Sequence, residues 1–418
     1  MGSSPLSNPA APGLPYYTPA QNPPAGSALD PSSAPTLFQP LQIRGTTLHN
    51  RFVVSPMCQY SAQDGILSDY HLVHLGQFAK AGAALTIVEA TAVEARGRIS
   101  PHDSGLWSDE HVAPLKRIVE FIHSQGTKAG IQLSHAGRKA STLAPWISEG
   151  HGRALATSEF GGWPDDTVSS SAIPFAPNYA TPRELSVAEI QSVVQAFADA
   201  ARRAVTAGFD TIELHAAHGY LLNQFLSPLS NTRTDDYGGN FDNRTRLLRE
   251  VISAIRAVIP ESMPLWVRIS ATEWMEWDGK PTWDIEESIR LARILPSLGV
   301  DLLDVSSGGN NSGQKIEISK YYQANLAGKI RKIVQDEGLK LLIGAVGFIS
   351  EAEMARDLCQ EGSDKAVGSE EKGVPKADVV IIAREFLRDP HFVLHSAQEL
   401  HVPVKWPNQY HRAPRRTH

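Results

Sequence analysis

Short apolar runs recur along the chain, and a segment with helical spacing follows each of them. Eight of these runs are expected to form strands: Arg51–Met57, Leu85–Ala92, Ala129–Ser134, Thr211–Ala216, Leu265–Ser270, Leu302–Ser306, Leu341–Val346 and Ala377–Ala383. Most are apolar nearly throughout, as parallel strands covered on both faces are. Eight strand–helix units predict one α/β domain, a (β/α)8 or TIM barrel.

The helix after the fourth strand has the clearest boundaries. It begins at Ser186-Val187-Ala188-Glu189, a capping box, and apolar residues follow at helical spacing from Ile190 to Val205. Gly208 is expected to end it, since glycine readily adopts the left-handed conformation that closes helices.

The composition along the chain divides it into a barrel and its additions. Residues 1–36 are rich in Pro, Ser and Ala and carry one charge, which predicts a disordered tail. Residues 37–405 are expected to form the barrel, with insertions at 138–185 and 363–376 that lie on the surface. Residues 406–418 form a C-terminal tail.

Charge and cysteine content exclude several classes of protein. The 418 residues include 39 Lys and Arg against 45 Asp and Glu, a net charge of −6, so no basic field favours nucleic acid. Two cysteines, Cys58 and Cys359, are too few for a disulfide scaffold or an iron–sulfur cluster, and they suit a reducing compartment. No apolar run reaches the ~18 residues of a membrane span. We therefore expect a cytoplasmic protein with no membrane partner.

Chemistry in such barrels sits at the carboxyl ends of the strands. No dinucleotide fingerprint, P-loop or nucleophile elbow occurs in the sequence. No lysine lies within the expected strands, which disfavours a Schiff-base aldolase. His215 and His218 could be metal ligands, but no nearby residue obviously supplies a third, so we predict no metal.

The ends of the last two strands could hold a phosphate. Gly347 follows the seventh strand, and Ala383-Arg384 ends the eighth, where this fold commonly binds phosphate. Gly347 alone fits a tight turn equally well, and Arg384 favours the phosphate. Arg268, pointing into the barrel mouth, needs an anionic partner, and a reduced flavin is one.

Several motifs together resemble the old yellow enzyme family over residues 37–412. The cysteine of the first motif and a Gln-Tyr-His-Arg near the C-terminus are similar to the thermophilic-like, bacterial-type class III branch of FMN ene-reductases. The motifs are Ser55-Pro56-Met57-Cys58, Gln132, His215-Ala216-Ala217-His218-Gly219-Tyr220-Leu221, Asn231-Thr232-Arg233-Thr234-Asp235-Asp236-Tyr237-Gly238-Gly239, Gly344-Ala345-Val346-Gly347 and Gln409-Tyr410-His411-Arg412.

The resemblance implies a set of binding and catalytic residues. Non-covalent FMN would be bound by Ser55, Pro56, Met57, Cys58, Ala90, Gln132, Arg268, Gly347, Ala383 and Arg384. His215 and His218 would hold the substrate's carbonyl oxygen, Tyr60 would line the same pocket, and Tyr220 would donate the proton. Cys58 would tune the flavin potential. The family usually has glycine where this chain has Ala383, and the retained N–H is expected to preserve phosphate binding.

The implied reaction is reduction of an activated C=C bond in two steps that share one pocket. NADPH or NADH first reduces FMN and leaves, and an enone or enal then enters and takes the hydride. In the branch that this chain resembles, an arginine matching Arg412 enters the neighbouring subunit's site, which implies a homodimer or higher homo-oligomer.

Other functions stay open from the sequence. The same barrel can carry another flavin oxidoreductase or an isomerase, or it can be a flavin-free lyase or binding protein. Taken alone, Cys58 fits a small buried apolar residue and Tyr220 a loop aromatic. The physiological substrate and the preference between NADPH and NADH cannot be derived.

Overall fold

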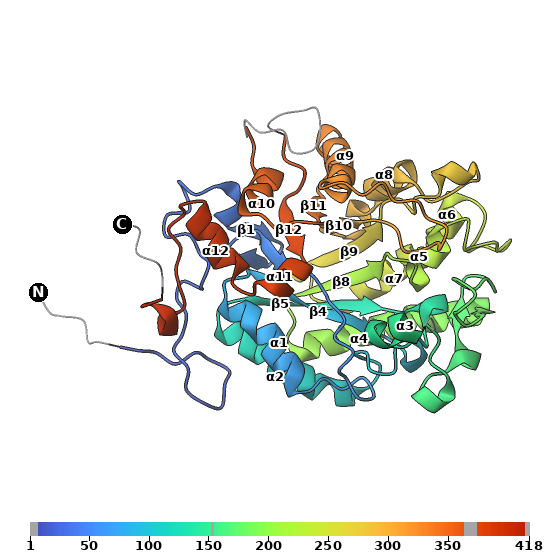
Figure 1. Ribbon diagram of the computed structural model, residues 1–418, viewed down its shortest axis with the longest axis horizontal. Coiled ribbons are helices and arrows are strands. Elements are labelled where there is room, and N and C mark those ends of the chain that lie inside the picture. The colour runs from blue at the N-terminus through green and yellow to red at the C-terminus, as the bar shows by residue number, and fades with distance from the viewer. Residues whose placement is uncertain (1–6, 152–153, 363–373, 414–418) are drawn as a thin grey trace, which may run out of the picture.

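The computed structural model describes residues 7–151, 154–362 and 374–413, and it contains a closed barrel of eight parallel strands (Figure 1). The strands follow each other around the barrel in chain order, and β12 pairs with β3 to close it. They are β3 (Phe52–Val54), β4 (Leu85–Ala92), β5 (Lys128–Ser134), β8 (Thr211–Ala216), β9 (Leu265–Ser270), β10 (Leu302–Ser306), β11 (Leu342–Ala345) and β12 (Val379–Ile382). The predicted (β/α)8 fold is confirmed.

Strand boundaries agree with the sequence prediction to within a few residues. Four strands, β4, β8, β9 and β10, match at both ends. The largest difference is in β3, where pairing stops at Val54 although the apolar run suggested Met57. Residues 55–57 instead leave the sheet at its carboxyl end, which places them at the barrel mouth.

Helices surround the barrel and bury their apolar faces against it (Figure 1). The longer ones are α1 (Asp69–Lys80), α2 (Val112–Ser124), α4 (Val187–Ala207), α7 (Arg246–Arg256), α8 (Ile285–Ile294), α9 (Tyr322–Asp336), α10 (Ala352–Cys359) and α12 (Phe392–Glu399). The capping box of α4 is confirmed: Ser186 Oγ accepts the Glu189 N–H at 3.3 Å, and Glu189 accepts the Ser186 N–H at 2.9 Å. Gly208 ends α4 at a φ of 93°.

A short hairpin closes the amino end of the barrel. It consists of β1 (Leu41–Ile43) and β2 (Thr46–Leu48). Ile43 and Leu48 pack against the fully buried Trp266 and Ile381 inside the barrel. Because this packing fills the amino end, the carboxyl ends of the strands are left as the place for a ligand.

The prediction of a disordered tail over residues 1–36 is wrong for the residues that the structure describes. Residues 7–35, here called the N-terminal strap, lie along the C-terminal segment. Gly26 N–H donates to Lys405 O at 2.8 Å, and Lys405 N–H donates to Ser27 O at 2.8 Å. Ala28 and Ala34 belong to a buried apolar cluster. Proline and alanine are uncharged and compact, so this composition also suits a segment that packs against a folded surface.

The two insertions differ from each other. Residues 138–185 were expected on the surface, yet many of them are buried and they cover the loops after β4 and β5. They include α3 (Pro145–His151), β6 (Val168–Ser169) and β7 (Arg183–Glu184). Of the 363–376 insertion, residues 363–373 lie outside the described residues. Its end at Lys376 is buried, and Nζ donates to Asn325 Oδ1 at 2.7 Å.

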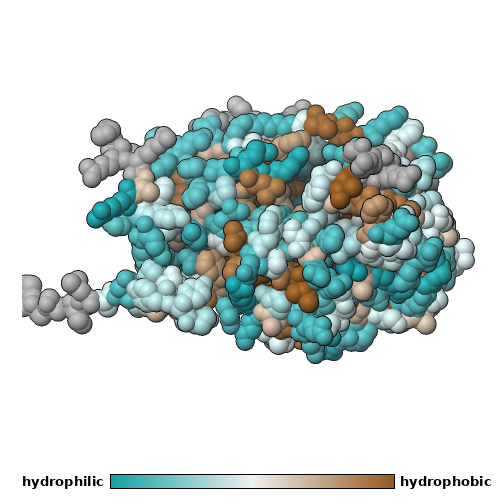
Figure 2. Space-filling view, turned by 60° about the horizontal axis from the view of Figure 1, so that its bottom comes forward, coloured by the Kyte–Doolittle hydropathy of each residue, from teal (hydrophilic) through white to brown (hydrophobic). Residues whose placement is uncertain are grey.

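The described helices include none that is long and apolar enough to span a membrane. Figure 2 shows a face on which hydrophilic residues predominate and apolar residues form separate groups. Large apolar side chains that are exposed somewhere on the molecule include Trp146, Phe160, Trp277 and Ile318.

Removing the N-terminal strap is expected to destabilise the barrel. A net hydrogen bond contributes about 1 kcal/mol, and 1 kcal/mol corresponds to about 2–4 °C in a domain of 150–250 residues. Deletion of residues 1–29 should therefore lower the Tm by at least about 3 °C, measured by circular dichroism. Deletion of residues 1–6 is the control and should leave the Tm unchanged. Equal Tm values for the two deletions would contradict the docked strap.

Candidate active site

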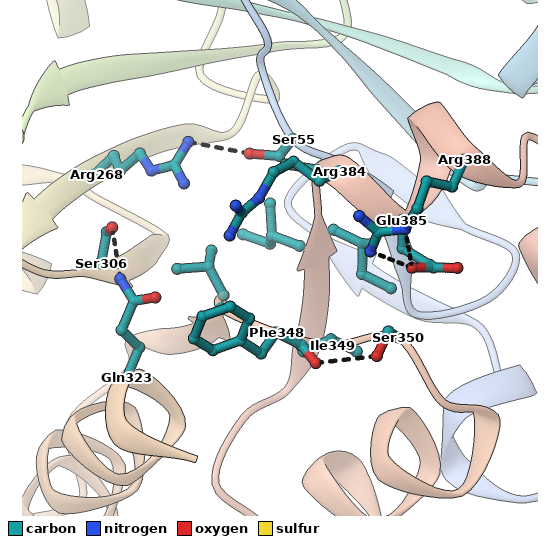
Figure 3. Close-up of a pocket in the computed structure, with 15 residues that line it drawn as sticks. Ser55, Arg268, Ser306, Gln323, Phe348, Ile349, Ser350, Arg384, Glu385 and Arg388 are labelled. Carbon is teal, nitrogen blue, oxygen red and sulfur yellow. Dashed lines mark hydrogen bonds and ion pairs between the residues drawn. The ribbon is translucent and has the colours of Figure 1, made fainter. Parts of the chain in front are cut away.

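A cavity of about 260 Å³ opens at the carboxyl ends of the strands. Residues that were predicted from separate strands meet in its wall, namely Ser55, Arg268, Gly347, Ala383 and Arg384. Figure 3 shows the guanidinium groups of Arg268 and Arg384 pointing into the same space. The wall also contains Ser306 and Gln323, which the sequence analysis missed. Ser306 ends an ordinary strand and Gln323 lies on a helix outside any motif, so neither gave a signal.

The end of the cavity near β11 and β12 requires a glycine. Gly347 has a φ of 97°, and a Cβ at this position would lie 2.2 Å from Gln323 Oε1. Backbone conformation and space therefore both exclude a side chain. Ala383 has a negative φ of −104°, so alanine does not meet the left-handed strain that would demand glycine. The substitution leaves its backbone N–H in place.

Arg268 has an anionic partner within the protein. Its Nη1 donates to Ser55 Oγ at 3.0 Å, and its Nε lies 3.2 Å from Asp304 Oδ2. Asp304, on β10, is fully buried. The sequence analysis looked for the counter-charge of Arg268 in a ligand and missed Asp304, which reads as one polar residue in an apolar strand.

The remaining residues implied for FMN binding lie after β3 and in the carboxyl halves of β4 and β5, and they are not among the residues that line the 260 Å³ cavity. Pro56 and Met57 are half-buried after β3, Ala90 is buried in β4, and Gln132 is buried in β5. The register between β4 and β5 shifts between Val88 and Thr91. Such bulges at barrel rims redirect side chains, and this one contains Ala90.

His215, His218 and Tyr220 form one cluster at the end of β8. The ring centres of His215 and His218 are 5.1 Å apart, and those of His215 and Tyr220 are 4.8 Å apart. His218 and Gly219 both have positive φ, 58° and 74°. This turn reverses the chain tightly enough to place all three rings on one side of the mouth.

The two histidines are held in the neutral form. Ala217 N–H donates to His215 Nδ1 at 3.3 Å, so the proton of the neutral ring is on Nε2. His218 Nε2 lies 2.7 Å from Ser306 Oγ. Burial, with the positive charges of Arg268 and Lys139 nearby, holds the pKa of both imidazoles well below 6.5.

Lys139, in the segment after β5, supports this cluster. Its Nζ donates to the carbonyl oxygens of His218 at 2.9 Å and Gly309 at 3.0 Å. The same ammonium lies 5.2 Å from the centre of the Tyr220 ring. Burial, and then the charge of Arg138, lower the pKa of Lys139 to about 8. Lys139 therefore fixes the turn that carries His218 and Tyr220.

Cys58 and Tyr60 lie in the loop after β3, and both are close enough to Tyr220 to affect its pKa. Cys58 is a free, half-buried thiol, and burial next to Asp103 and Glu89 raises its pKa well above the usual range. Burial raises the pKa of the Tyr60 and Tyr220 phenols in the same way. Cys58 and both tyrosines therefore keep their protons at neutral pH.

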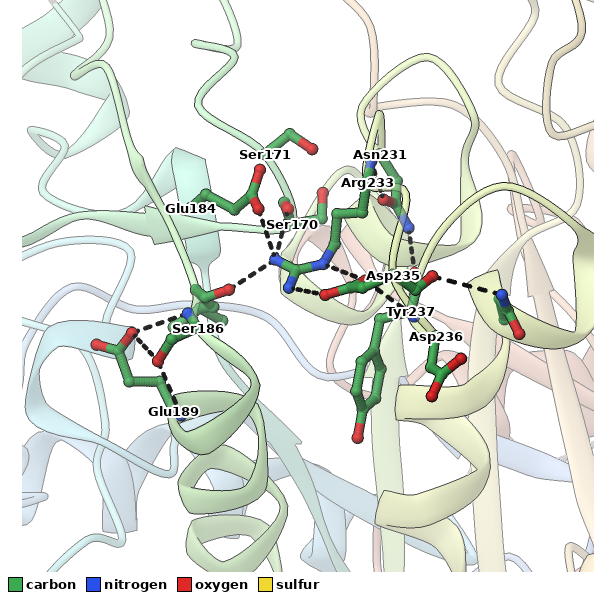
Figure 4. A network of polar contacts seen from close by, with 12 residues as sticks. Ser170, Ser171, Glu184, Ser186, Glu189, Asn231, Arg233, Asp235, Asp236 and Tyr237 are labelled. Atoms are coloured by element: carbon green, nitrogen blue, oxygen red, sulfur yellow. Dashed lines mark hydrogen bonds and ion pairs between the residues drawn. The ribbon is translucent and has the colours of Figure 1, made fainter.

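The Asn231–Gly239 motif forms a structural clamp. Arg233 Nη1 donates to Leu185 O at 2.6 Å and to Ser170 O at 3.2 Å, and its Nε donates to Asp235 at 3.0 Å (Figure 4). Asn231 Nδ2 donates to Tyr237 O at 2.8 Å. The motif ties residues 168–186 to the loop after β8, so it shapes the mouth indirectly.

Arg412 stands apart from the cavity. It is exposed, and no contact among the described residues joins it to the cluster. Its segment docks on the N-terminal strap, where Asn408 N–H donates to Gln21 Oε1 at 2.9 Å. Within the described part of the chain no three His, Cys, Asp or Glu side chains are grouped to hold a metal ion.

Comparisons with known proteins agree on one family. The model of the NADH:flavin oxidoreductase / NADH oxidase family matches residues 36–402. An NADH:flavin oxidoreductase of Gibberella zeae is 47% identical over 97% of this chain and 95% of its own, and an NADPH dehydrogenase of Bacillus pumilus is 43% identical over 90% and 98%. The structure of an old yellow enzyme homologue from Zymomonas mobilis matches with a TM-score of 0.66 and 26% identity, over 89% of this chain and 94% of that one.

The neutral histidines predict a loss of stability in acid. Their folded pKa is lowered, so below about pH 6.5 the unfolded chain binds protons that the folded chain does not. As the pH is lowered below about 6.5, the free energy of unfolding should decrease by up to about 1.4 kcal/mol per histidine per pH unit. Urea unfolding at pH 7.5 and 5.5 should show a smaller loss in His215→Gln/His218→Gln than in wild type. The control, at the exposed His401, is His401→Gln. A loss in the double variant as large as in wild type would contradict the assignment.

Proposed function

The chain belongs to the old yellow enzyme family of NADH:flavin oxidoreductases, and from that membership we propose that it reduces the activated C=C bond of α,β-unsaturated carbonyl compounds. It is a flavin oxidoreductase that binds FMN without a covalent bond and uses NAD(P)H as electron donor. A flavin-free lyase or binding protein is thereby excluded. The choice of C=C reduction over other flavin chemistry is the proposal.

The cavity suits FMN on two observations. Gly347 lines the cavity with a φ of 97° and without a side chain, so a phosphate can approach the backbone there. Arg268 Nε–H lies 3.2 Å from Asp304 Oδ2 but donates no hydrogen bond within the protein. We assign the phosphate to Gly347, Ala383 and Arg384. The ring system is assigned to Arg268, Gln132, Ala90 and residues 55–58. When bound, FMN supplies the two-electron chemistry, accepting reducing equivalents from NADPH or NADH and passing them to the alkene in a second step.

The observation that carries the proposal is the cluster of two neutral imidazoles and one phenol after β8. His215 presents Nε2–H, and His218 lies beside it on the strained turn held by Lys139. Both rings can hydrogen-bond one carbonyl oxygen and stabilise the negative charge that grows there, as an oxyanion hole does. This polarisation makes the β-carbon of an enone electrophilic.

Tyr220 is proposed as the general acid. Its phenol is protonated, and its ring lies 4.8 Å from that of His215, so a substrate whose oxygen is held by the histidines has its α-carbon near this ring. Tyr60 and Trp146 pack edge to face at 5.5 Å and are proposed to exclude water from the bound alkene. Cys58 stays a thiol beside them, where it is proposed to tune the flavin potential.

The resemblance to the class III branch also implies an active site to which two subunits contribute. We propose that Arg412 crosses a two-fold interface and adds a permanently charged, planar donor to the neighbour's substrate pocket. The exposure of Arg412 and the docking of its segment on the N-terminal strap support this, because the segment is held in place while the Arg412 side chain is exposed. A cytoplasmic location, suggested by the free Cys58 and Cys359, stays a prediction.

Tyr220→Phe should slow alkene reduction and spare the first half-reaction. The change removes the acid but keeps the ring, and general acid catalysis contributes about 10²–10⁴-fold. Anaerobic stopped-flow should show near-normal FMN reduction by NADPH and a reoxidation by 2-cyclohexenone slowed by that factor. Tyr179→Phe, which removes a neighbouring phenol, is the control and should change neither step. Equal slowing of both half-reactions in Tyr220→Phe would make the residue structural, and no slowing would assign the proton to another donor.

Arg412→Ala should raise the KM for the enone while FMN content stays at one per chain. Steady-state kinetics and the absorbance of released flavin measure the two effects. Light scattering should show at least a dimer for wild type. Arg415→Ala, the next arginine along the chain, is the matched control for charge. A monomeric wild type, together with unchanged kinetics in Arg412→Ala, would refute the shared site.

A further inference from the structure

Two carboxyl groups lie beneath the proposed ring site, on neighbouring sides of Arg268. Glu213 is on β8 and Asp304 on β10, with Arg268 between them on β9. Both acids are fully buried, and their carboxyl groups are within hydrogen-bonding reach of each other. The proposed enone reduction uses neither.

Hydrogen bonding within this cluster is incomplete if both acids are ionised. Glu213 Oε1 accepts Gln132 Nε2–H at 2.8 Å, whereas Glu213 Oε2 and both Asp304 oxygens accept no hydrogen bond. The ion pair with Arg268 at 3.2 Å balances one negative charge. The negative charge of a second buried carboxylate would remain uncompensated, which is costly. One proton shared between the two acids removes that second charge. Burial accordingly raises the pKa of both groups.

The same cluster contacts the side chains assigned to the flavin ring. Gln132 donates to Glu213, and that bond fixes which way its amide faces. Arg268 bonds Ser55 with Nη1 while its Nε faces Asp304. Only one side chain therefore separates the proposed flavin ring from the acid pair on each route, Gln132 on one and Arg268 on the other.

We propose that Glu213 and Asp304 form a proton-accepting pair that compensates the charge of reduced FMN. The inference rests on the proposed placement of FMN against Gln132 and Arg268. Reduction by NADPH brings two electrons and one proton to FMN and so adds one negative charge. The pair, which already shares one proton, then binds a second proton from solvent, forming one O–H bond and changing its own charge from −1 to 0. Reoxidation of FMN releases that proton.

Among the described residues, the strands beside Glu213 and Asp304 carry no other group that would more simply accept this proton. The charged group that faces the pair is Arg268 of β9, β5 presents the neutral Gln132, and β11 presents Gly344 opposite Asp304. His215 and His218 also lie in the field of Arg268, which lowers their pKa. They are the alternative site for the proton, and the experiment separates the two.

The pH dependence of the FMN midpoint potential tests the proposal on the holoenzyme. One proton taken up with two electrons changes the equilibrium tenfold per pH unit, which is 29.6 mV. Wild type should show about twice this slope over part of the range from pH 6 to 10, and Glu213→Gln should show the single-proton slope throughout. Asp304→Asn should behave like Glu213→Gln. Asp301→Asn is the matched control, since Asp301 precedes the same strand and pairs with Arg44 away from the site.

Direct proton counting on wild type gives a second measurement. With a pH indicator during anaerobic dithionite titration, uptake should rise from one toward two protons per FMN, in the same pH range as the steeper slope. A single-proton slope and an uptake of one at every pH would overturn the proposal even if the variants do not fold. Extra uptake that survives in Glu213→Gln and disappears in His215→Gln/His218→Gln would also overturn it. Failure of enone reduction, by contrast, would leave these slopes unchanged and count only against the proposed function.

Discussion

Pairing between β12 and β3 is the constraint on which the site depends. Three residue pairs, Val380 with Phe52, Ile381 with Val53 and Ile382 with Val54, join the last strand to the first and close the sheet. Because the strands are parallel, their carboxyl ends must then meet at one mouth. Ser55 thereby comes to line the same cavity as Ala383 and Arg384, more than 300 positions away along the chain. Filling of the amino end by the β1–β2 hairpin leaves that mouth as the place for the cofactor.

Charge is arranged around Arg268 at the centre of this mouth. The guanidinium faces the cavity on one side and Asp304 on the other, so its charge is available to a flavin without being unpaired in the protein. Burial, together with this charge and that of Lys139, keeps His215 and His218 neutral. Neutral imidazoles donate hydrogen bonds while leaving the acid role to Tyr220. In the proposed function, one buried cation would thus serve cofactor binding, substrate polarisation and the division of roles among the donors.

Much of the fold could be predicted from the sequence because the barrel strands are apolar and short. Leu85–Ala92 and Thr211–Ala216 match at both ends, since local composition alone decides such buried strands. Asp304, Glu213 and Lys139 could not be found this way, because their importance comes from partners on other strands and loops. The N-terminal strap was also missed, since nothing in a Pro-rich sequence reveals that residues 403–405 will pair with it. Sequence therefore predicted the mouth of the barrel and not what supports it.

The proposed function requires that this mouth directs reduction to the C=C bond of an enone, with protonation at the α-carbon. NMR of the product formed from 2-cyclohexenone and NADPH in D2O tests it most directly. If the proposed function is right, the product is cyclohexanone with one deuterium at the α-carbon and none at the β-carbon. An allylic alcohol, deuterium from solvent at the β-carbon, or unchanged cyclohexenone beside NADPH-reduced FMN would contradict it.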